Sequence, residues 1–355
     1  MPDIAVTYSL SPFVSAYPWT SGTGFGAKYT DPTTAIPDGA NGLAFQGSAD
    51  VAVAHATTPF VSAYPWTPGA GFGTKYTNPT TGPTGSGIAV GFQGSADIVI
   101  AHSATPFVSA YPWTPGTGFG TKYTNPTTPP SSAGRGVAFQ GSTEVAIGHN
   151  LTPFISTYPW TPGTGFGTKY TNPTTPPVSV GNGVDFQGSA DIAVAHNTTP
   201  FVSAYPWTPG TGFGTKYTNP VTGPAGNGQE VAFQGSTEVA IAHSATPFVS
   251  AYPWTSGTGF GTKYTNPTTL PQGTGLGVAF LGSVDIAVSH DGTPFVSVYP
   301  WTIGTGFGTK YTDPVTPPVS TGSGVAFTVT AAVGFLPTAM RAVELEVEPP
   351  GVTAY

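Results

Sequence analysis

Residues 107–114 read Phe-Val-Ser-Ala-Tyr-Pro-Trp-Thr, and the last four of them, Tyr-Pro-Trp-Thr, occur seven times in the chain. The seven copies begin at residues 17, 64, 111, 158, 205, 252 and 299, so that every interval is 47 residues. A fixed period of about 40 to 50 residues is typical of propeller blades and of helical arrays, in which each repeat is one supersecondary unit. The spacing therefore predicts that nearly all of the 355 residues belong to one repeat array.

The composition of one unit, residues 89–135, favours strands over helices. Four short segments rich in β-branched and aromatic residues are separated by clusters of Gly, Ser, Thr and Pro. We predict strands around Phe92 and over residues 97–102, 107–113 and 120–124. Proline recurs too often for long helices, which excludes the helical arrays.

The two faces of the segment 107–113 differ in bulk. Tyr111 and Trp113 share one face, and Val108 and Ala110 share the other, because side chains alternate along a strand. A sheet that is apolar on both faces must be covered on both. Copies stacked face to face would place bulky side chains against small ones, as in neighbouring propeller blades.

The ends of the array predict a closed ring. The repeat pattern begins at Asp3, within the second strand of a unit. The last unit supplies only a first strand, 324–327. An open solenoid would need polar capping repeats, and closure removes exposed sheet edges. We therefore predict an all-β fold: a seven-bladed β-propeller of four-stranded antiparallel blades over residues 1–330. Strand 324–330 would complete the first blade, and residues 331–355 would form a C-terminal extension.

The charges exclude several classes of function. Only 7% of residues are charged, the net charge is −7, and there is no cysteine. A lysine recurs every 47 residues, from Lys28 to Lys310, and an acid does so from Asp3 to Asp285. No basic patch exists, so we expect no nucleic-acid partner. We also expect no disulfide, no signal peptide and no membrane insertion.

The whole unit resembles a known class of repeat. The run Val-Ala-Phe-x-Gly-Ser-x-Asp-Ile-Ala-Val-Ala-His is similar to the first hairpin of WD40-like repeats. The unit over residues 3–330 resembles WD40-like repeat proteins encoded by tailed bacteriophages. The Trp-Asp and Gly-His pairs of true WD40 repeats are absent, so the hydrogen-bonded tetrad of those blades is not carried over.

Six histidines, His55, His102, His149, His196, His243 and His290, also lie 47 residues apart, with Tyr8 in the first unit. They could form a ring of metal ligands, but equivalent positions in neighbouring sheets lie about 10 Å apart, too far to share one ion. A structural role at the strand end is the alternative. The ring of acids likewise gives no close pair around one substrate. We find no unique polar cluster, and predict no enzyme, no catalytic residue, no cofactor and no metal.

Tryptophan supplies a candidate for carbohydrate binding. Trp66, Trp113, Trp160, Trp207 and Trp254 could stack on sugars, as the aromatic side chains of lectin propellers do. The alternative is that these residues pack between blades and contribute buried apolar area.

The last 25 residues depart from the repeat. Val343, Leu345 and Val347 alternate with glutamates, which predicts a strand with one apolar face. Together with Phe335, Leu336 and Arg341 they are candidates for docking on a partner; the alternative is a strap on the propeller surface.

These features lead to one expected function and one alternative. We expect a non-enzymatic structural or interaction protein of a bacteriophage virion, a head decoration or tail-associated protein. Its partners would be other virion proteins and host-surface glycans. The alternative is a multivalent carbohydrate-binding lectin.

Overall fold

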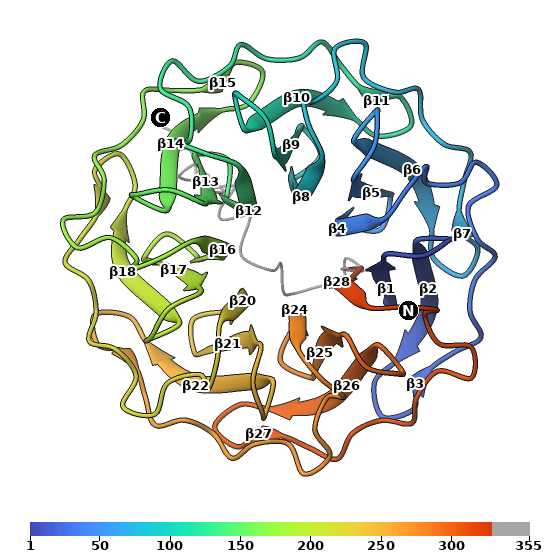
Figure 1. Cartoon of the computed structure of the whole chain (residues 1–355). Coiled ribbons are helices and arrows are strands. Elements are labelled where there is room, and N and C mark those ends of the chain that lie inside the picture. Colours follow the sequence, from blue (N-terminus) through green and yellow to red (C-terminus); the bar gives the residue numbers. More distant parts are fainter. Residues whose placement is uncertain (329–355) are drawn as a thin grey trace, which may run out of the picture.

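The computed structural model describes residues 1–328, which form seven four-stranded antiparallel sheets arranged around a central axis (Figure 1). The predicted all-β, seven-bladed propeller is therefore confirmed. The C-terminal extension, with Phe335, Leu336, Arg341, Val343, Leu345 and Val347, lies outside the described residues. Within residues 1–328, no helix is long and apolar enough to cross a membrane.

Each blade contributes its strands in order from the axis outward. The innermost strands are β28 (Gly322–Phe327), β4 (Ala40–Gln46), β8 (Gly87–Gln93), β12 (Gly134–Gln140), β16 (Gly181–Gln187), β20 (Gly228–Gln234) and β24 (Gly275–Leu281). The second strands are β1 (Asp3–Tyr8), β5 (Asp50–His55), β9 (Asp97–His102), β13 (Glu144–His149), β17 (Asp191–His196), β21 (Glu238–His243) and β25 (Asp285–His290).

The two outer strands of each blade differ greatly in length. The third strands are β2 (Val14–Thr20), β6 (Val61–Thr67), β10 (Val108–Thr114), β14 (Ile155–Thr161), β18 (Val202–Thr208), β22 (Val249–Thr255) and β26 (Val296–Thr302). The outermost strands have two residues each: β3 (Gly24–Phe25), β7 (Gly71–Phe72), β11 (Gly118–Phe119), β15 (Gly165–Phe166), β19 (Gly212–Phe213), β23 (Gly259–Phe260) and β27 (Gly306–Phe307). The outer strand predicted over 120–124 is thus misplaced, since the ladder ends at Phe119.

The ring closes through the two ends of the array, as predicted. Strand β28 pairs with β1 in the register Ile4↔Phe327, Ala5↔Ala326 and Val6↔Val325. The pairing continues at Thr328, whose backbone N–H donates to the carbonyl of Asp3 at 2.8 Å. In Figure 1 the red strand β28 lies beside the dark blue strand β1.

Neighbouring blades pack a small face against a bulky face. Ala52, Ala54, Val61 and Ala63 of one blade lie in the same buried cluster as Tyr111 and Trp113 of the next. All of these side chains are almost fully buried. The same arrangement recurs in the other core clusters, so that the hydrophobic core consists of seven wedges between blades.

A hydrogen-bonded latch also joins each blade to the next. The carboxylate of Asp50, at the start of β5, accepts from the Tyr76 hydroxyl of its own blade at 2.6 Å. It also accepts from the indole Nε1–H of Trp113 in the following blade at 3.0 Å. The Tyr76 oxygen in turn accepts from the Gly116 amide of that following blade at 3.0 Å. The repeated acids therefore hold neighbouring blades together.

Candidate functional site

A cavity of about 610 Å³ lies on the propeller axis, where the innermost strands of all seven blades meet. Its walls are the first residues of these strands, such as 41–44 of β4 and 182–185 of β16. The blade cores repeat almost without change, but the side chains that face the axis do not. The cavity is therefore a place in the described chain where the seven-fold symmetry is broken.

One ring of side chains shows this variation most clearly. The second residue of each innermost strand lines the cavity, and we call these seven residues the mouth ring. The ring comprises Asn41, Ile88, Arg135, Asn182, Gln229, Leu276 and Ser323, which are spaced by 47 residues. Five residue types other than Asn stand at one structural position, so neither the fold nor the blade core dictates the residue there.

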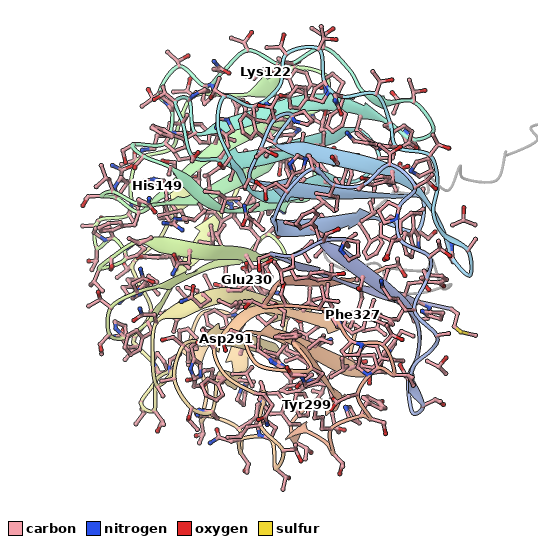
Figure 2. All side chains as sticks on the ribbon, turned by 45° about the vertical axis from the view of Figure 1, so that its right-hand side comes forward. Lys122, His149, Glu230, Asp291, Tyr299 and Phe327 are labelled. Atoms are coloured by element: carbon pink, nitrogen blue, oxygen red, sulfur yellow. The ribbon has the colours of Figure 1, made fainter. Side chains whose placement is uncertain are left out.

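Two carboxyl groups lie in the cavity on adjacent innermost strands. Asp185 belongs to β16 and Glu230 to β20. The position of Asp185 holds Ala44, Ala138, Ala232, Ala279 and Ala326 in five other blades and Gly91 in the sixth. The position of Glu230 holds Gly42, Gly136, Gly183, Gly277 and Gly324 in five other blades and Ala89 in the sixth. The other six blades therefore fold with only alanine or glycine at either position. In Figure 2, Glu230 lies near the middle of the molecule, whereas Lys122 and Tyr299 lie toward its periphery.

Backbone amides hold the Asp185 carboxylate. The Phe233 N–H of the neighbouring strand β20 donates to its Oδ2 at 2.7 Å, and the Phe186 N–H donates to its Oδ1 at 2.9 Å. Innermost strands have one edge that faces the axis, so their N–H groups are available to such a side chain. Asp185 thus spans from its own strand to β20.

Glu230 makes fewer contacts and lies across the backbone of the strand that carries Asp185. The Val231 N–H donates to its Oε1 at 3.1 Å. A Cβ placed on Gly183 of β16 would lie 2.3 Å from Oε1 of Glu230 and 2.7 Å from its Cα. Glycine is thus required at 183 for β20 and the Glu230 side chain to approach β16, which brings the two carboxyls to neighbouring strands.

Burial raises the pKa of both carboxyls into the neutral range. The pKa of Asp185 rises to about 7, although its two amide donors oppose the rise. The pKa of Glu230 rises to about 8, mainly through burial and in addition through the charge of Asp185, while the Val231 amide opposes it. Desolvation disfavours the charged form, and a neighbouring carboxylate adds to the effect. Near neutral pH the two groups therefore hold between one and two protons.

The structure overturns the expectation that no unique polar cluster exists. Asp185, Glu230 and the polar members of the mouth ring form such a cluster, and none of them was predicted from the sequence. The signal was present in the sequence: each carboxyl interrupts an otherwise small residue at a repeated position. Only the fold shows that these two interruptions, 45 residues apart, face one cavity.

The six repeated histidines are buried within the blades, where each pairs with a serine. The Nε2 atom of His102 lies 2.9 Å from Oγ of Ser109 on the adjacent strand β10, and both residues are buried. Burial lowers the pKa of His102 to about 4, so the ring is neutral near pH 7. His55, His149, His196, His243 and His290 repeat this pairing. No group of three or more His, Cys, Asp or Glu side chains suited to a metal ion occurs among residues 1–328.

The tryptophans proposed to stack on sugars are part of the core. Trp66, Trp160, Trp207 and Trp254 are 3% exposed, and Trp113 is 2% exposed. Each of their indole N–H groups donates to a carboxylate of the preceding blade. Their ring faces are covered by neighbouring aromatic side chains in edge-to-face contacts. They are not accessible to a glycan, and the packing alternative is the correct one.

Comparison with known proteins places the fold among propellers of two kinds. No protein-family model matches the chain, and no curated protein matches it either. The solved structures that resemble it include a candidate 6-phosphogluconolactonase from Bacteroides fragilis, with 12% identity and a TM-score of 0.71. That match covers 92% of this chain and 97% of the other. A candidate 6-phosphogluconolactonase from Bacteroides uniformis matches with 12% identity and a TM-score of 0.68, over 92% and 99% of the two chains.

The WD40 likeness is also supported at the level of the fold. The WD40 propeller domain of Doa1 matches with 11% identity and a TM-score of 0.55, over 80% of this chain and 84% of the other. The expectation of a non-enzymatic virion protein is overturned, because the similar structures include proteins described as lactonases. The bacteriophage origin, the virion partners and the virion location stay predictions from the sequence. What these comparisons establish is that the chain has the fold of a seven-bladed β-propeller with WD40-like and lactonase-like neighbours.

Proposed function

We propose that this protein is a hydrolase that opens a small lactone in the axial cavity, with Asp185 and Glu230 as its acid–base pair. The observation that carries the proposal is the placement of two partly buried carboxyls on adjacent strands of one cavity, at positions where the repeat otherwise has Ala or Gly. Carboxyls in a cleft whose pKa values are raised toward neutrality are frequent in active sites. The description of similar propellers as candidate 6-phosphogluconolactonases supports the choice of a lactone.

The two carboxyls are suited to different roles. Asp185 accepts two amide N–H groups, which favour its ionised form, whereas Glu230 accepts one and is opposed by the Asp185 charge. Asp185 is therefore the base, and Glu230, which keeps its proton at neutral pH, is the acid.

The reaction follows from these roles. Asp185 removes a proton from a water molecule as the water oxygen forms a bond to the lactone carbonyl carbon. The ring C–O bond then breaks, and Glu230 gives its proton to the departing ring oxygen. One water is consumed and one hydroxy acid is formed. Asp185 then gives its proton to solvent and Glu230 takes one up from solvent, which restores the starting state of the pair.

Proton release tests the proposal, because the hydroxy acid is fully ionised at neutral pH and so releases one proton per lactone opened. We expect the purified protein to hydrolyse D-glucono-1,5-lactone or its 6-phosphate faster than the uncatalysed reaction, as followed with a pH indicator. Asp185→Asn removes the base and Glu230→Gln removes the acid, each with little change in side-chain volume. Each variant should lower kcat by about 100-fold or more.

Asp313→Asn is the matched control. Asp313 is an exposed carboxylate that pairs with Lys310. This variant should keep the wild-type rate. A wild-type protein that gives no rate above the uncatalysed reaction with either lactone would disprove the proposal, and so would full activity in both carboxyl variants.

A further inference from the structure

The hydrogen-bonding groups of the cavity are unevenly distributed along its axis. Arg135 belongs to the mouth ring, while Glu230 lies one residue and Asp185 three residues further along their strands. At about 3.3 Å per residue, Asp185 is about 10 Å deeper than the mouth ring. Among the lining residues from the described part of the chain, the one cationic residue is thus at the mouth and the acidic residues are inside.

Arg135 is already engaged where it stands. Its Nε–H donates to Oδ1 of Asn150 at 2.6 Å, and the side chain is exposed to solvent. A guanidinium at an exposed rim is screened by water and salt. It is therefore a weak anchor for an anionic group.

The Asn182 amide of the mouth ring has no donor left for a substrate. The Nδ2 of Asn182 donates to Oδ1 of Asn197 at 2.6 Å and to the carbonyl of Gly228 at 2.7 Å, which accounts for both of its protons. Its Oδ1 remains as an acceptor. The Asn41 Nδ2 donates to the Gly87 carbonyl at 2.7 Å, and the Ser323 hydroxyl donates to the Ala40 carbonyl. Amide and hydroxyl oxygens at the mouth and the Asp185 carboxylate further in therefore remain as acceptors, and the two ionisable side chains inside the cavity are both acids.

These acceptors favour a ligand that carries donors. Sugar hydroxyls can donate to each of these oxygens. A phosphate monoester carries a charge of about −1.5 to −2 at pH 7 and mainly accepts hydrogen bonds. Placed in this cavity, it would face acceptor oxygens and the charge of Asp185.

From this distribution we infer that the substrate is an uncharged, polyhydroxylated lactone, whose hydroxyls donate to Asn182 and its neighbours, and not a phosphorylated one. The inference rests on the proposed function, since it assigns a substrate class to the same cavity. Arg135 is then a residue of the rim and not an anchor for a phosphate.

The test compares D-glucono-1,5-lactone with its 6-phosphate under identical conditions. We expect kcat/KM for the uncharged lactone to be higher by about 10-fold or more, a difference within the range that a few polar contacts supply. Equal rates, or a preference for the phosphate, would overturn the inference but leave the proposed function standing. Hydrolysis of neither lactone would remove the proposed function itself.

Two variants locate the origin of the preference. Arg135→Asn introduces the residue that the same ring has at Asn41 and Asn182, and should change kcat/KM for either lactone by less than about 3-fold. A selective loss with the phosphate would show that Arg135 anchors it and would contradict the inference. Asn182→Leu introduces the residue of Leu276, so the ring tolerates its shape. It should raise KM for the uncharged lactone several-fold with a smaller change in kcat, and an unchanged KM would contradict the role of Asn182.

Discussion

Single carboxylates at the start of the second strands link the blades. Asp97 is fully buried and accepts from Tyr123 of its own blade at 2.5 Å and from Trp160 of the next at 3.0 Å. A buried carboxylate is stable only when such donors compensate its loss of hydration. Glu144 and Glu238 occupy the same position in two other blades, where Oε1 also accepts from the Gly210 and Gly304 amides.

Replacement of Asp97 tests this link. Asp97→Ala leaves the Trp160 and Tyr123 donors without partners inside the protein, which should cost about 2 to 4 kcal/mol. Asp97→Glu should cost less than about 1 kcal/mol, because two blades already carry glutamate there. The midpoint of urea unfolding, monitored by tryptophan fluorescence, measures both. Equal midpoints for the two variants would contradict the link.

Single residues in the sequence carried too little information to predict the site. A hydrogen bond from Trp113 to Asp50 joins residues 63 positions apart in different blades, so the repeat spacing alone does not reveal it. The burial of Trp66 could be expected from packing, but not its bond to Asp3. Asp185 could have been recognised as an interruption of an alanine position, although its approach to β20 depends on the ring geometry.

At the scale of strands, the carboxyls on β16 and β20 lower the free energy of unfolding as the pH rises. The pKa of Asp185 and Glu230 is raised in the folded protein, so from about pH 4 upward the unfolded chain ionises them while the folded protein keeps them protonated. The unfolded state then binds fewer protons, and stability falls as the pH rises through about 7 and 8.

The double variant Asp185→Ala and Glu230→Ala should remove this decline. Both replacements occur naturally at equivalent positions, as Ala138 and Ala89. The variant should unfold at higher urea than the wild type at about pH 9, by several kcal/mol, and the difference should shrink toward about pH 5. Activity should be lost at every pH. A variant less stable than the wild type at high pH would show that the carboxyls support the fold.

Strand boundaries were predicted unevenly for a physical reason. The second and third strands are long and apolar on both faces, and the second strand lies where the sequence placed it, at Asp97–His102. The outermost strand has only two residues, and the chain beyond Phe119 is held by other contacts, such as the Tyr123 amide bonded to the Ala110 carbonyl at 2.9 Å. β-Propensity marks such a segment as a strand although it forms no ladder.

At the scale of the whole molecule, the number of blades and the closure followed from the sequence. The 47-residue spacing gave the count, and the incomplete units at the two ends gave the pairing of β28 with β1. Both are properties of the repeat as a whole. The axial cavity could not be predicted in this way, because it depends on side chains that differ between blades.

Removal of residues 324–330 should open the ring. Strand β1 would keep β2 but lose β28 and expose an unpaired edge, which favours association between chains. Size-exclusion chromatography with light scattering should then show multimers. A chain that ends at Thr328 keeps β28 and is the control, and it should match the size of the full chain. A monomeric species for the 324–330 deletion would contradict the role of this pairing.

The variability of the mouth ring has a consequence for how this protein can change. Asn, Ile, Arg, Gln, Leu and Ser already occupy one structural position within a single chain, at equal depth and around a common axis. Substitutions there leave the wedges between blades and the carboxylate latches untouched, since those lie farther from the axis. Selectivity in this propeller can therefore evolve, or be engineered, one blade at a time, by recombining seven interchangeable positions on a scaffold whose stability is supplied elsewhere.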